Sequence, residues 1–288
     1  MRWTNYHSHC RYCDGSDQPE RYVEQALTEG LLAYGFSSHA PLPFDCEWCL
    51  KTDELRAYFQ EIVNLQYRWR EDIQLYCGLE VDYIPGVIGP KSAFLRQLPF
   101  DYFIGSVHFV DSFPDGPRWE IDGSHPVFLR GLAQIFGGDA QAAVTRYFAL
   151  TRQMVREEPP DVVGHLDKIK IQNEEGRLFS ETDDWYRAEM TETLDVIAEA
   201  GVMVEVNTRG LYRKKATDTY PSRWVLEQMH RMNIPVVISS DAHRPAEITS
   251  HFAETARTLK EIGYSRVRVL LNGKWRSVAF DDAGVLGM

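Results

Sequence analysis

Short apolar segments typical of β-strands alternate with amphipathic, helix-like segments along this chain of 288 residues. Such alternation predicts an α/β fold with a parallel sheet. The predicted strands cover residues 2–9, 33–39, 73–83, 101–110, 161–166, 202–207 and 235–240. The predicted helices cover residues 19–30, 52–70, 91–98, 140–157, 185–200, 222–232 and 246–262. Because no linker or change of composition interrupts the pattern, we expect residues 1–288 to form one domain, a closed or nearly closed (β/α) barrel of the TIM type.

Two segments do not fit the alternation. Asn272-Gly273 lies between two runs of alternating hydrophobicity, which predicts a tight β-hairpin over about residues 266–280. Residues 111–139 contain scattered proline, glycine and aspartate and are predicted to be a long irregular segment. Long loops in compact domains commonly lie over a functional site, so we expect this segment to cover one.

The composition limits the partners of the chain. Its net charge of −11, from 31 basic and 42 acidic residues, argues against a surface that binds nucleic acid. A small phosphorylated substrate can still bind where positive charge is concentrated. No basic region followed by an apolar run marks a signal peptide, and no segment reaches the ~18 apolar residues of a membrane span. We therefore expect a cytoplasmic protein without membrane contact; the sequence leaves no trace of its oligomeric state.

The five cysteines comprise two Cys-x-x-Cys pairs, Cys10/Cys13 and Cys46/Cys49, and the single Cys77. Free thiols are the main expectation in a reducing compartment. A structural zinc site that joins the two pairs is the alternative, although the segment between them exceeds the usual ~15–20 residues.

Six of the nine histidines lie where a predicted strand meets a turn. These six are His7, His9, His39, His108, His165 and His243. In a (β/α) barrel the carboxyl ends of the strands open on one face, so these imidazoles would converge. The other three fall on a loop (His125) or on predicted helices (His230 and His251).

Three carboxylates accompany these histidines. Glu80 lies within an apolar strand, where an unpaired charge is costly to bury, while Asp241 directly follows a strand and Asp14 follows the first two histidines. Imidazole and carboxylate groups bind zinc, manganese and iron. Nine ligands are too many for one ion, but with bridging carboxylates they suit two or three ions about 3.5–4 Å apart. The sequence therefore predicts a centre of two or three divalent ions of Zn, Mn or Fe.

Six short motifs contain most of these residues. They are H-x-H at 7–9, G-F-S-S-H at 35–39, G-L-E at 78–80, G-S-V-H at 105–108, G-H-L-D at 164–167 and S-S-D-A-H at 239–243. In this order they resemble the motifs of the PHP (polymerase and histidinol phosphatase) superfamily. V-E-V-N-T-R-G-L-Y at 204–212 and T-Y-P-S at 219–222 are similar to the histidinol-phosphate phosphatases within it. The resemblance implies a distorted seven-stranded (β/α) barrel that holds three metal ions.

The resemblance also implies how the ligands divide among these ions. One ion would be bound by His7, His9, Glu80 and Asp241. Glu80 would bridge to a second ion, bound by His108 and His165, and a third would be bound by His39 and His243. Many relatives complete the third site with a histidine in the first loop, where this chain offers Asp14 or, as a weaker alternative, a cysteine.

The implied activity is hydrolysis of a phosphate monoester, most specifically of L-histidinol phosphate to L-histidinol and phosphate in histidine biosynthesis. A metal-bridging hydroxide would attack phosphorus in line while the ions neutralise the non-bridging oxygens. The predicted catalytic residues are Glu80, Asp241 and His243. Asp241, His243 and a metal-bound water are the candidates to protonate the leaving alkoxide. The sequence contains no motif for an aspartyl or cysteinyl nucleophile and no glycine-rich phosphate loop.

Basic residues that follow strand ends are candidates to clamp the phosphate. They are Arg209, Lys168, Lys170, Arg213 and Arg244. An acidic residue of segment 111–139, such as Glu120 or Asp122, is a candidate to face the cationic amine of histidinol phosphate.

Other functions remain open from the sequence. The same metal centre can serve a phosphodiesterase, an exonuclease or a phosphatase acting on another small molecule. The acidic net charge and the lack of a basic stripe with interleaved aromatic residues weigh against a polynucleotide substrate. A non-catalytic metal-binding or scaffolding protein would not need every ligand type.

Overall fold

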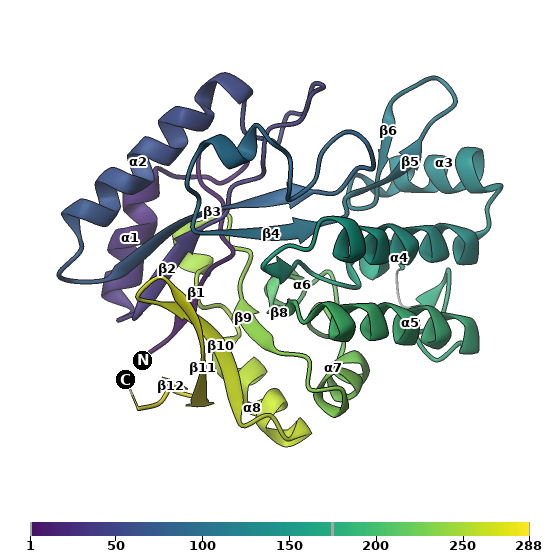
Figure 1. Cartoon of the computed structure of the whole chain (residues 1–288). Helices are drawn as coiled ribbons and strands as arrows, with labels where there is room; N and C mark the ends of the chain where they lie inside the picture. Colours follow the sequence, from purple (N-terminus) through teal and green to yellow (C-terminus); the bar gives the residue numbers. More distant parts are fainter. Residues whose placement is uncertain (1, 174–175, 288) are drawn as a thin grey trace.

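A computed structural model, which describes residues 2–173 and 176–287, contains a parallel seven-stranded sheet curled into a nearly closed barrel (Figure 1). Its strands, in spatial order, are β1 (Thr4–Asn5), β2 (Ala33–Phe36), β3 (Gln74–Asp82), β4 (Tyr102–Ser106), β7 (Val162–Val163), β8 (Met203–Asn207) and β9 (Val236–Ser239). Every neighbouring pair is parallel, so all seven carboxyl ends lie on one face. The predicted α/β barrel is confirmed.

The barrel closes between its first and last strands through a short seam. Ser8 forms an isolated parallel bridge with Ala242, and the amide of His9 donates to the carbonyl of Ala242 at 2.8 Å. The side-chain amide of Asn5 donates to the hydroxyl of Ser240 at 2.8 Å. These contacts place the end of β1 directly beside the end of β9.

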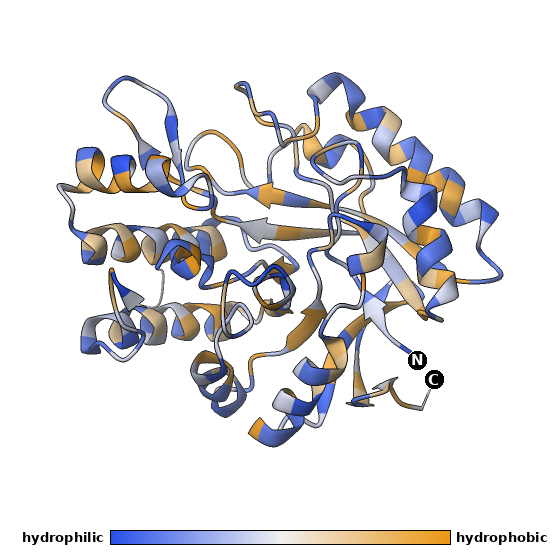
Figure 2. Ribbon diagram, turned by 180° about the vertical axis from the view of Figure 1, so that it is seen from behind, coloured by the Kyte–Doolittle hydropathy of each residue, from blue (hydrophilic) through white to orange (hydrophobic). Residues whose placement is uncertain are grey.

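Helices surround the barrel and turn apolar faces toward it, as the hydropathy colouring in Figure 2 shows. They are α1 (Pro19–Thr28), α2 (Leu55–Arg68), α3 (His125–Phe136), α4 (Ala140–Glu157), α5 (Asp184–Ala200), α6 (Arg209–Tyr212), α7 (Arg223–Arg231) and α8 (Phe252–Ile262). Short 3₁₀ helices are η1 (Thr52–Glu54), η2 (Leu95–Gln97), η3 (Lys168–Gln172) and η5 (Pro245–Glu247). In α2 the buried residues recur every three or four positions, as expected for an amphipathic helix: Leu55, Tyr58, Ile62 and Leu65. Within the described ranges, no helix combines the length and apolar character needed to cross a membrane.

Aromatic side chains fill the end of the barrel where the strands begin. The hydroxyl of Tyr102 donates to the carbonyl of Phe36 at 3.0 Å, so its ring crosses the interior. Gly78 leaves room for this ring, because a Cβ at that position would lie 2.6 Å from the Cζ atom of Tyr102. Trp275, from the C-terminal sheet, packs edge-on against Tyr6 with ring centroids 5.2 Å apart.

The C-terminal sheet closes this same end. Its strands are β10 (Arg266–Leu271), β11 (Lys274–Asp281) and β12 (Gly284–Val285), and all its pairings are antiparallel. Asn272 and Gly273 form the tight turn, and both have the positive φ that this turn type requires. The amide of Asn272 donates to the side chain of Gln74, the first residue of β3, at 2.7 Å.

Segment 111–139 is not irregular as predicted. It contains the last residues of β5 (Phe109–Ser112), then β6 (Arg118–Glu120) and α3, and the two strands form an antiparallel hairpin. Trp119 is fully buried and packs on Phe128 and Phe136 at centroid distances of 5.1 and 5.5 Å. This aromatic contact orders a segment rich in proline and glycine. His125, predicted on a loop, is the first residue of α3.

Several strands stop earlier than predicted at their carboxyl ends. β1 ends at Asn5 and β7 at Val163, so His7, His9 and His165 lie beyond the ladders. At His165 a side chain replaces the ladder bond, because its amide donates to the carboxylate of Glu205 at 2.6 Å. The chain thus leaves the sheet where its polar side chains turn into the site.

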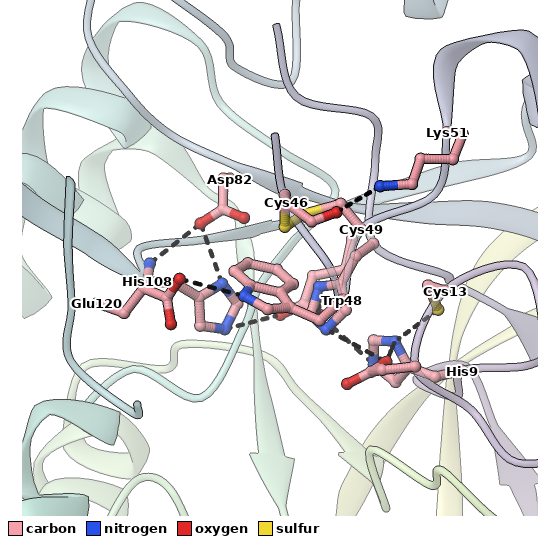
Figure 3. Close-up of a disulfide and its surroundings, with 12 residues drawn as sticks. His9, Cys13, Cys46, Trp48, Cys49, Lys51, Asp82, His108 and Glu120 are labelled. Carbon is pink, nitrogen blue, oxygen red and sulfur yellow. Dashed lines mark hydrogen bonds and ion pairs between the residues drawn. A yellow bond between two sulfur atoms is a disulfide. The ribbon is translucent and has the colours of Figure 1, made fainter. Parts of the chain in front are cut away.

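Cys46 and Cys49 form a disulfide in the loop between β2 and η1 (Figure 3). Their Cα atoms are 5.4 Å apart, within the ordinary range for a disulfide, so the expectation of free thiols is wrong for this pair. Cys10, Cys13 and Cys77 are free. Among the described residues, no candidate metal-binding group includes a cysteine, which does not support a zinc site joining the two pairs.

Candidate metal centre

The carboxyl face of the barrel brings all nine predicted ligands together. Seven of them are buried: His7, His9, His39, Glu80, His108, His165 and Asp241. Asp14 and His243 lie at the edge of the cluster and are partly exposed, by 33% and 14% of their side-chain surfaces. Residues from both ends of the chain therefore meet around one point.

Glu80, on β3, lies at the middle of the cluster. Its Oε2 atom is 3.2 Å from Nε2 of His7, 3.5 Å from Nε2 of His9 and 3.0 Å from Nδ1 of His39. Its Oε1 atom is 2.9 Å from Nε2 of His165. The two carboxylate oxygens thus face different imidazoles, as a carboxylate that bridges two cations must.

The other two carboxylates face His9, His39 and His243. Oδ1 of Asp241 is 3.2 Å from Nε2 of His9. Oδ2 of Asp14 is 3.0 Å from Nε2 of His243, and its Oδ1 is 3.8 Å from Nε2 of His39. Asp14 therefore lies where the sequence comparison placed an acidic substitute for a histidine.

Three overlapping groups have ligand atoms close enough to hold an ion. They are His9 with Asp14, His39 and His243; His7 with His9 and Asp241; and His39 with Glu80 and His108. The overlap is typical of neighbouring ions that share ligands. The first group contains His39 and His243, as the family resemblance implies for the third ion, whereas Glu80 is grouped with His39 and His108 rather than with His7, His9 and Asp241.

Several buried nitrogens of this cluster lack hydrogen bonds. Nε2 of His7, Nε2 of His9 and Nδ1 of His39 have no hydrogen-bond partner among the described residues. A buried polar atom left without a partner costs about 1–3 kcal/mol, and these three all face the carboxylate of Glu80. Imidazole nitrogens and carboxylate oxygens converging in a buried space fit a divalent metal centre.

Two further buried carboxylates, which the sequence reasoning missed, fix the orientation of ligand histidines. Oε2 of Glu205 accepts from Nδ1 of His7 at 2.8 Å, and Oδ1 of Asp82 accepts from Nδ1 of His108 at 3.0 Å. Each bond places the proton on Nδ1 and leaves Nε2 available to the cluster.

The sequence carries a signal for both residues. Asp82 follows Glu80 by two positions on β3, so strand periodicity places both on one face. Glu205 is a charged residue inside the apolar strand β8, the same feature that singled out Glu80.

Charge interactions within the cluster keep its acids ionised. Burial raises the pKa of Glu80, but His7 and its neighbouring imidazoles outweigh that effect and hold the pKa well below its ordinary value. Burial likewise opposes ionisation of Asp241, while His7 and Arg209 hold its pKa well below the usual range. Burial keeps the pKa of His9 well below that of a free imidazole, so this ring stays in its neutral, ligand-competent form.

A cavity of about 350 Å³ opens above the cluster and contains most of the predicted cations. Lys168, Arg209 and Arg213 line it, together with Lys215, which the sequence reasoning missed because its loop carries no motif. Nζ of Lys168 lies 3.3 Å from Nε2 of His108. Four cationic side chains therefore line the cavity above a cluster rich in carboxylates.

Two predicted phosphate-binding residues do not line this cavity. The side chain of Lys170 is only 7% exposed, forms an ion pair with Asp167 at 2.7 Å and lines a neighbouring cavity instead. Arg244 is exposed on the surface next to His243. Lys168 and Lys170 are three and five positions after His165, and the turn of η3 directs them into different cavities.

Comparisons with known proteins point to one family. A model of the PHP domain family matches residues 5–209. A Deinococcus radiodurans protein named "Probable histidinol-phosphatase" is 30% identical over 260 residues, which cover 89% of this chain and 92% of that protein. The Bacillus subtilis protein named "Histidinol-phosphatase" is 28% identical over 264 residues, covering 86% of this chain and 96% of the relative.

One solved structure extends the comparison to the fold. It is a Lactococcus lactis histidinol phosphate phosphatase complexed with zinc, L-histidinol and phosphate. It matches with a TM-score of 0.69 at 21% identity and covers 99% of this chain and 98% of its own. The likeness shows that the two chains share the barrel fold.

Proposed function

The chain belongs to the PHP domain family, and we propose that it is a metal-dependent phosphatase that hydrolyses L-histidinol phosphate to L-histidinol and phosphate. The observation that carries this proposal is the carboxylate of Glu80, which faces imidazoles with both oxygens beneath a cavity lined by cations. The names of the relatives support the choice of substrate. The proposal treats residues 1–288 as one phosphoesterase domain acting on a small phosphorylated substrate in the cytoplasm.

We propose that the nine clustered residues bind two or three divalent ions of zinc, manganese or iron. Bound ions of this kind lower the pKa of water toward neutrality and neutralise the charge of a phosphoryl group. Zinc is favoured by its presence in the Lactococcus lactis structure. Glu80 would bridge two ions, because its two oxygens face different imidazoles, and Asp14 would bind the outer ion with His39 and His243.

The cations of this chain would bind and orient the phosphate. Lys168 is buried beside His108, and Arg209 is fixed by bonds to the carbonyl of Asp241 at 2.8 Å and to the hydroxyl of Tyr212 at 3.3 Å. Both would donate to non-bridging oxygens, and Arg213 would add a more exposed charge.

His243 would hold a proton for the leaving alkoxide only while its Nε2 atom does not bind the outer ion. Nη1 of Arg209 donates to Nδ1 of His243 at 2.7 Å, and a guanidinium has no acceptor. In this arrangement Nε2 of His243 carries the proton, 3.0 Å from Oδ2 of Asp14. Coordination through Nε2 needs the other tautomer, and Arg209 must then turn away from the ring, toward a bound phosphate.

The test is a substrate panel assayed with protein loaded with zinc or manganese. L-Histidinol phosphate, bis-p-nitrophenyl phosphate and a single-stranded DNA oligonucleotide are compared by release of phosphate, nitrophenol and nucleotides. We expect rapid release of phosphate from histidinol phosphate and background rates on the other two. Hydrolysis of the diester or of DNA without hydrolysis of the monoester would contradict the proposal and favour a phosphodiesterase or an exonuclease.

A further inference from the structure

We infer that Glu120 and Trp48 form an amine subsite, which binds the ammonium group of the substrate and selects amino-alcohol phosphates over other monoesters. This inference rests on the proposed function, because the amine belongs to the substrate proposed there. It assigns a role to one wall of the cavity that the metal cluster and the phosphate-binding cations leave unexplained.

The hairpin of β5 and β6 places Glu120 next to a metal ligand. β5 begins directly after His108, and Phe109 pairs with Glu120 across the hairpin. The amide of Ile121 donates to the carbonyl of His108 at 3.0 Å, which fixes the end of β6 beside the cluster. Glu120 consequently lines the same cavity as Lys168 and Arg209.

Trp48 forms the adjoining wall of the cavity, and Figure 3 shows it beside Glu120 and His108. Its ring lies edge-on to His39 at a centroid distance of 4.6 Å and stacks on Phe109 at 5.6 Å. The disulfide between Cys46 and Cys49 closes the short loop that carries it. Both the ring contacts and the closed loop therefore hold Trp48 in place above the metal ligands.

The carboxylate of Glu120 lacks a positive partner. Oε1 accepts a hydrogen bond from Nε1 of Trp48 at 3.3 Å, and no other hydrogen bond or ion pair joins Glu120 to the described residues. Its neighbour Asp122, by contrast, is paired with Lys168 at 2.8 Å. The other two carboxylates that line the cavity, Asp14 and Asp241, face histidines of the cluster.

One oxygen of Glu120 is thus free to accept hydrogen bonds from a cation in the cavity. An ammonium group is stabilised by a carboxylate, and the N–H of Trp48 orients the carboxylate of Glu120 through its bond to Oε1. In histidinol phosphate two carbons separate the ester oxygen from the amine, so a phosphate bound at the cluster carries its amine into the same cavity. A monoester without an amine would leave the charge of Glu120 uncompensated, and the subsite would therefore also disfavour such esters.

The test compares two substrates that differ only in the amine: L-histidinol phosphate and its deamino analogue, 3-(imidazol-4-yl)propyl phosphate. We expect Glu120→Gln to lower kcat/KM for histidinol phosphate by about 10–100-fold, the usual effect of losing a hydrogen bond between charged groups. Its kcat/KM for the deamino analogue should stay the same or rise. Trp48→Phe, which keeps a ring but removes the N–H donor, should shift the ratio of the two values in the same direction by a smaller factor.

Glu47→Gln is the matched control. Glu47 is exposed and lies next to Trp48 on the same loop, so this variant loses the same charge outside the cavity and should leave both values unchanged. Equal losses on both substrates in Glu120→Gln, or no loss on either, would overturn the amine subsite. A wild-type protein that hydrolyses both substrates equally would overturn the subsite but leave the proposed function standing. A wild-type protein inactive on histidinol phosphate would overturn both.

Discussion

The floor and the rim of the cavity are built in different ways. The floor consists of the nine predicted metal ligands, which are mostly buried and, apart from Asp14 in the first loop, lie on a strand of one sheet or within a few residues of its end. The rim consists of Trp48, Glu120, Arg213 and Lys215, which lie on loops and a hairpin, and both of its cations are exposed. The floor is built from strands of the whole barrel, whereas the rim is built from single loops and one hairpin. We infer that the floor sets the reaction and the rim sets the substrate.

Removal of the metal ions should produce the largest effect. Dialysis against a chelator is expected to reduce phosphate release to background, and zinc or manganese should restore it. The melting temperature should fall as well, because the imidazoles and carboxylates of the floor lose the cations that compensate them. Calorimetry and a phosphate assay on the same samples check both effects. Full activity after verified metal loss would show that the floor does not carry the reaction.

Glu80→Gln should produce the second largest loss of activity. The amide keeps the shape of the side chain, but it has only one oxygen that can bind a cation. In the wild type both oxygens of Glu80 face imidazoles of the cluster. Mutation of a residue that only orients a metal ligand typically lowers metal affinity or activity by about 10–100-fold. For a predicted ligand we therefore expect kcat to fall by more than about 100-fold. Steady-state kinetics and a metal analysis of the variant measure this. A loss confined to KM would contradict the central role of Glu80.

Glu205→Gln and Asp82→Asn should have intermediate effects of about 10–100-fold on metal affinity or kcat. Both residues orient ligand histidines through Nδ1 without facing the cavity. Competition with a chromophoric chelator reports the affinity. Asp195→Asn, at an exposed position of α5, is the control and should match the wild type. Wild-type metal affinity and kcat in both variants would mean that the floor does not need these partners.

Arg213→Ala and Lys215→Ala should have the smallest effects. Both side chains are exposed, and Arg213 approaches Glu247 only at 4.0 Å, so each charge is screened by solvent. We expect KM for histidinol phosphate to rise about 2–5-fold with little change in kcat, as for exposed ion pairs. The difference from the wild type should shrink as the salt concentration rises. A large loss in kcat from either variant would show that the residue takes part in the reaction and does not only assist substrate binding.

Sequence reasoning was more effective for the floor than for the rim, for a physical reason. Strand periodicity and the shared direction of parallel strands are local properties, so His7, Glu80 and Asp241 could be placed on one face from the sequence alone. The order of segment 111–139 depends on Trp119 packing against a helix further along the chain, a contact that no local pattern reveals. The prediction that Lys170 binds phosphate in this cavity failed for a similar reason. The short helix η3 directs Lys168 and not Lys170 into the cavity, and the sequence alone does not reveal its orientation.

The seam between Ser8 and Ala242 has a consequence for biosynthesis. His9 contacts Asp241 only when the first and last strands of the barrel are side by side. Because Asp241 lies more than two hundred residues after His9, this contact forms only after most of the chain has been synthesised. A ribosome-bound fragment ending before Asp241 would therefore hold early imidazoles without their closing carboxylate. Competence for catalysis should appear late and abruptly during synthesis, rather than growing with chain length.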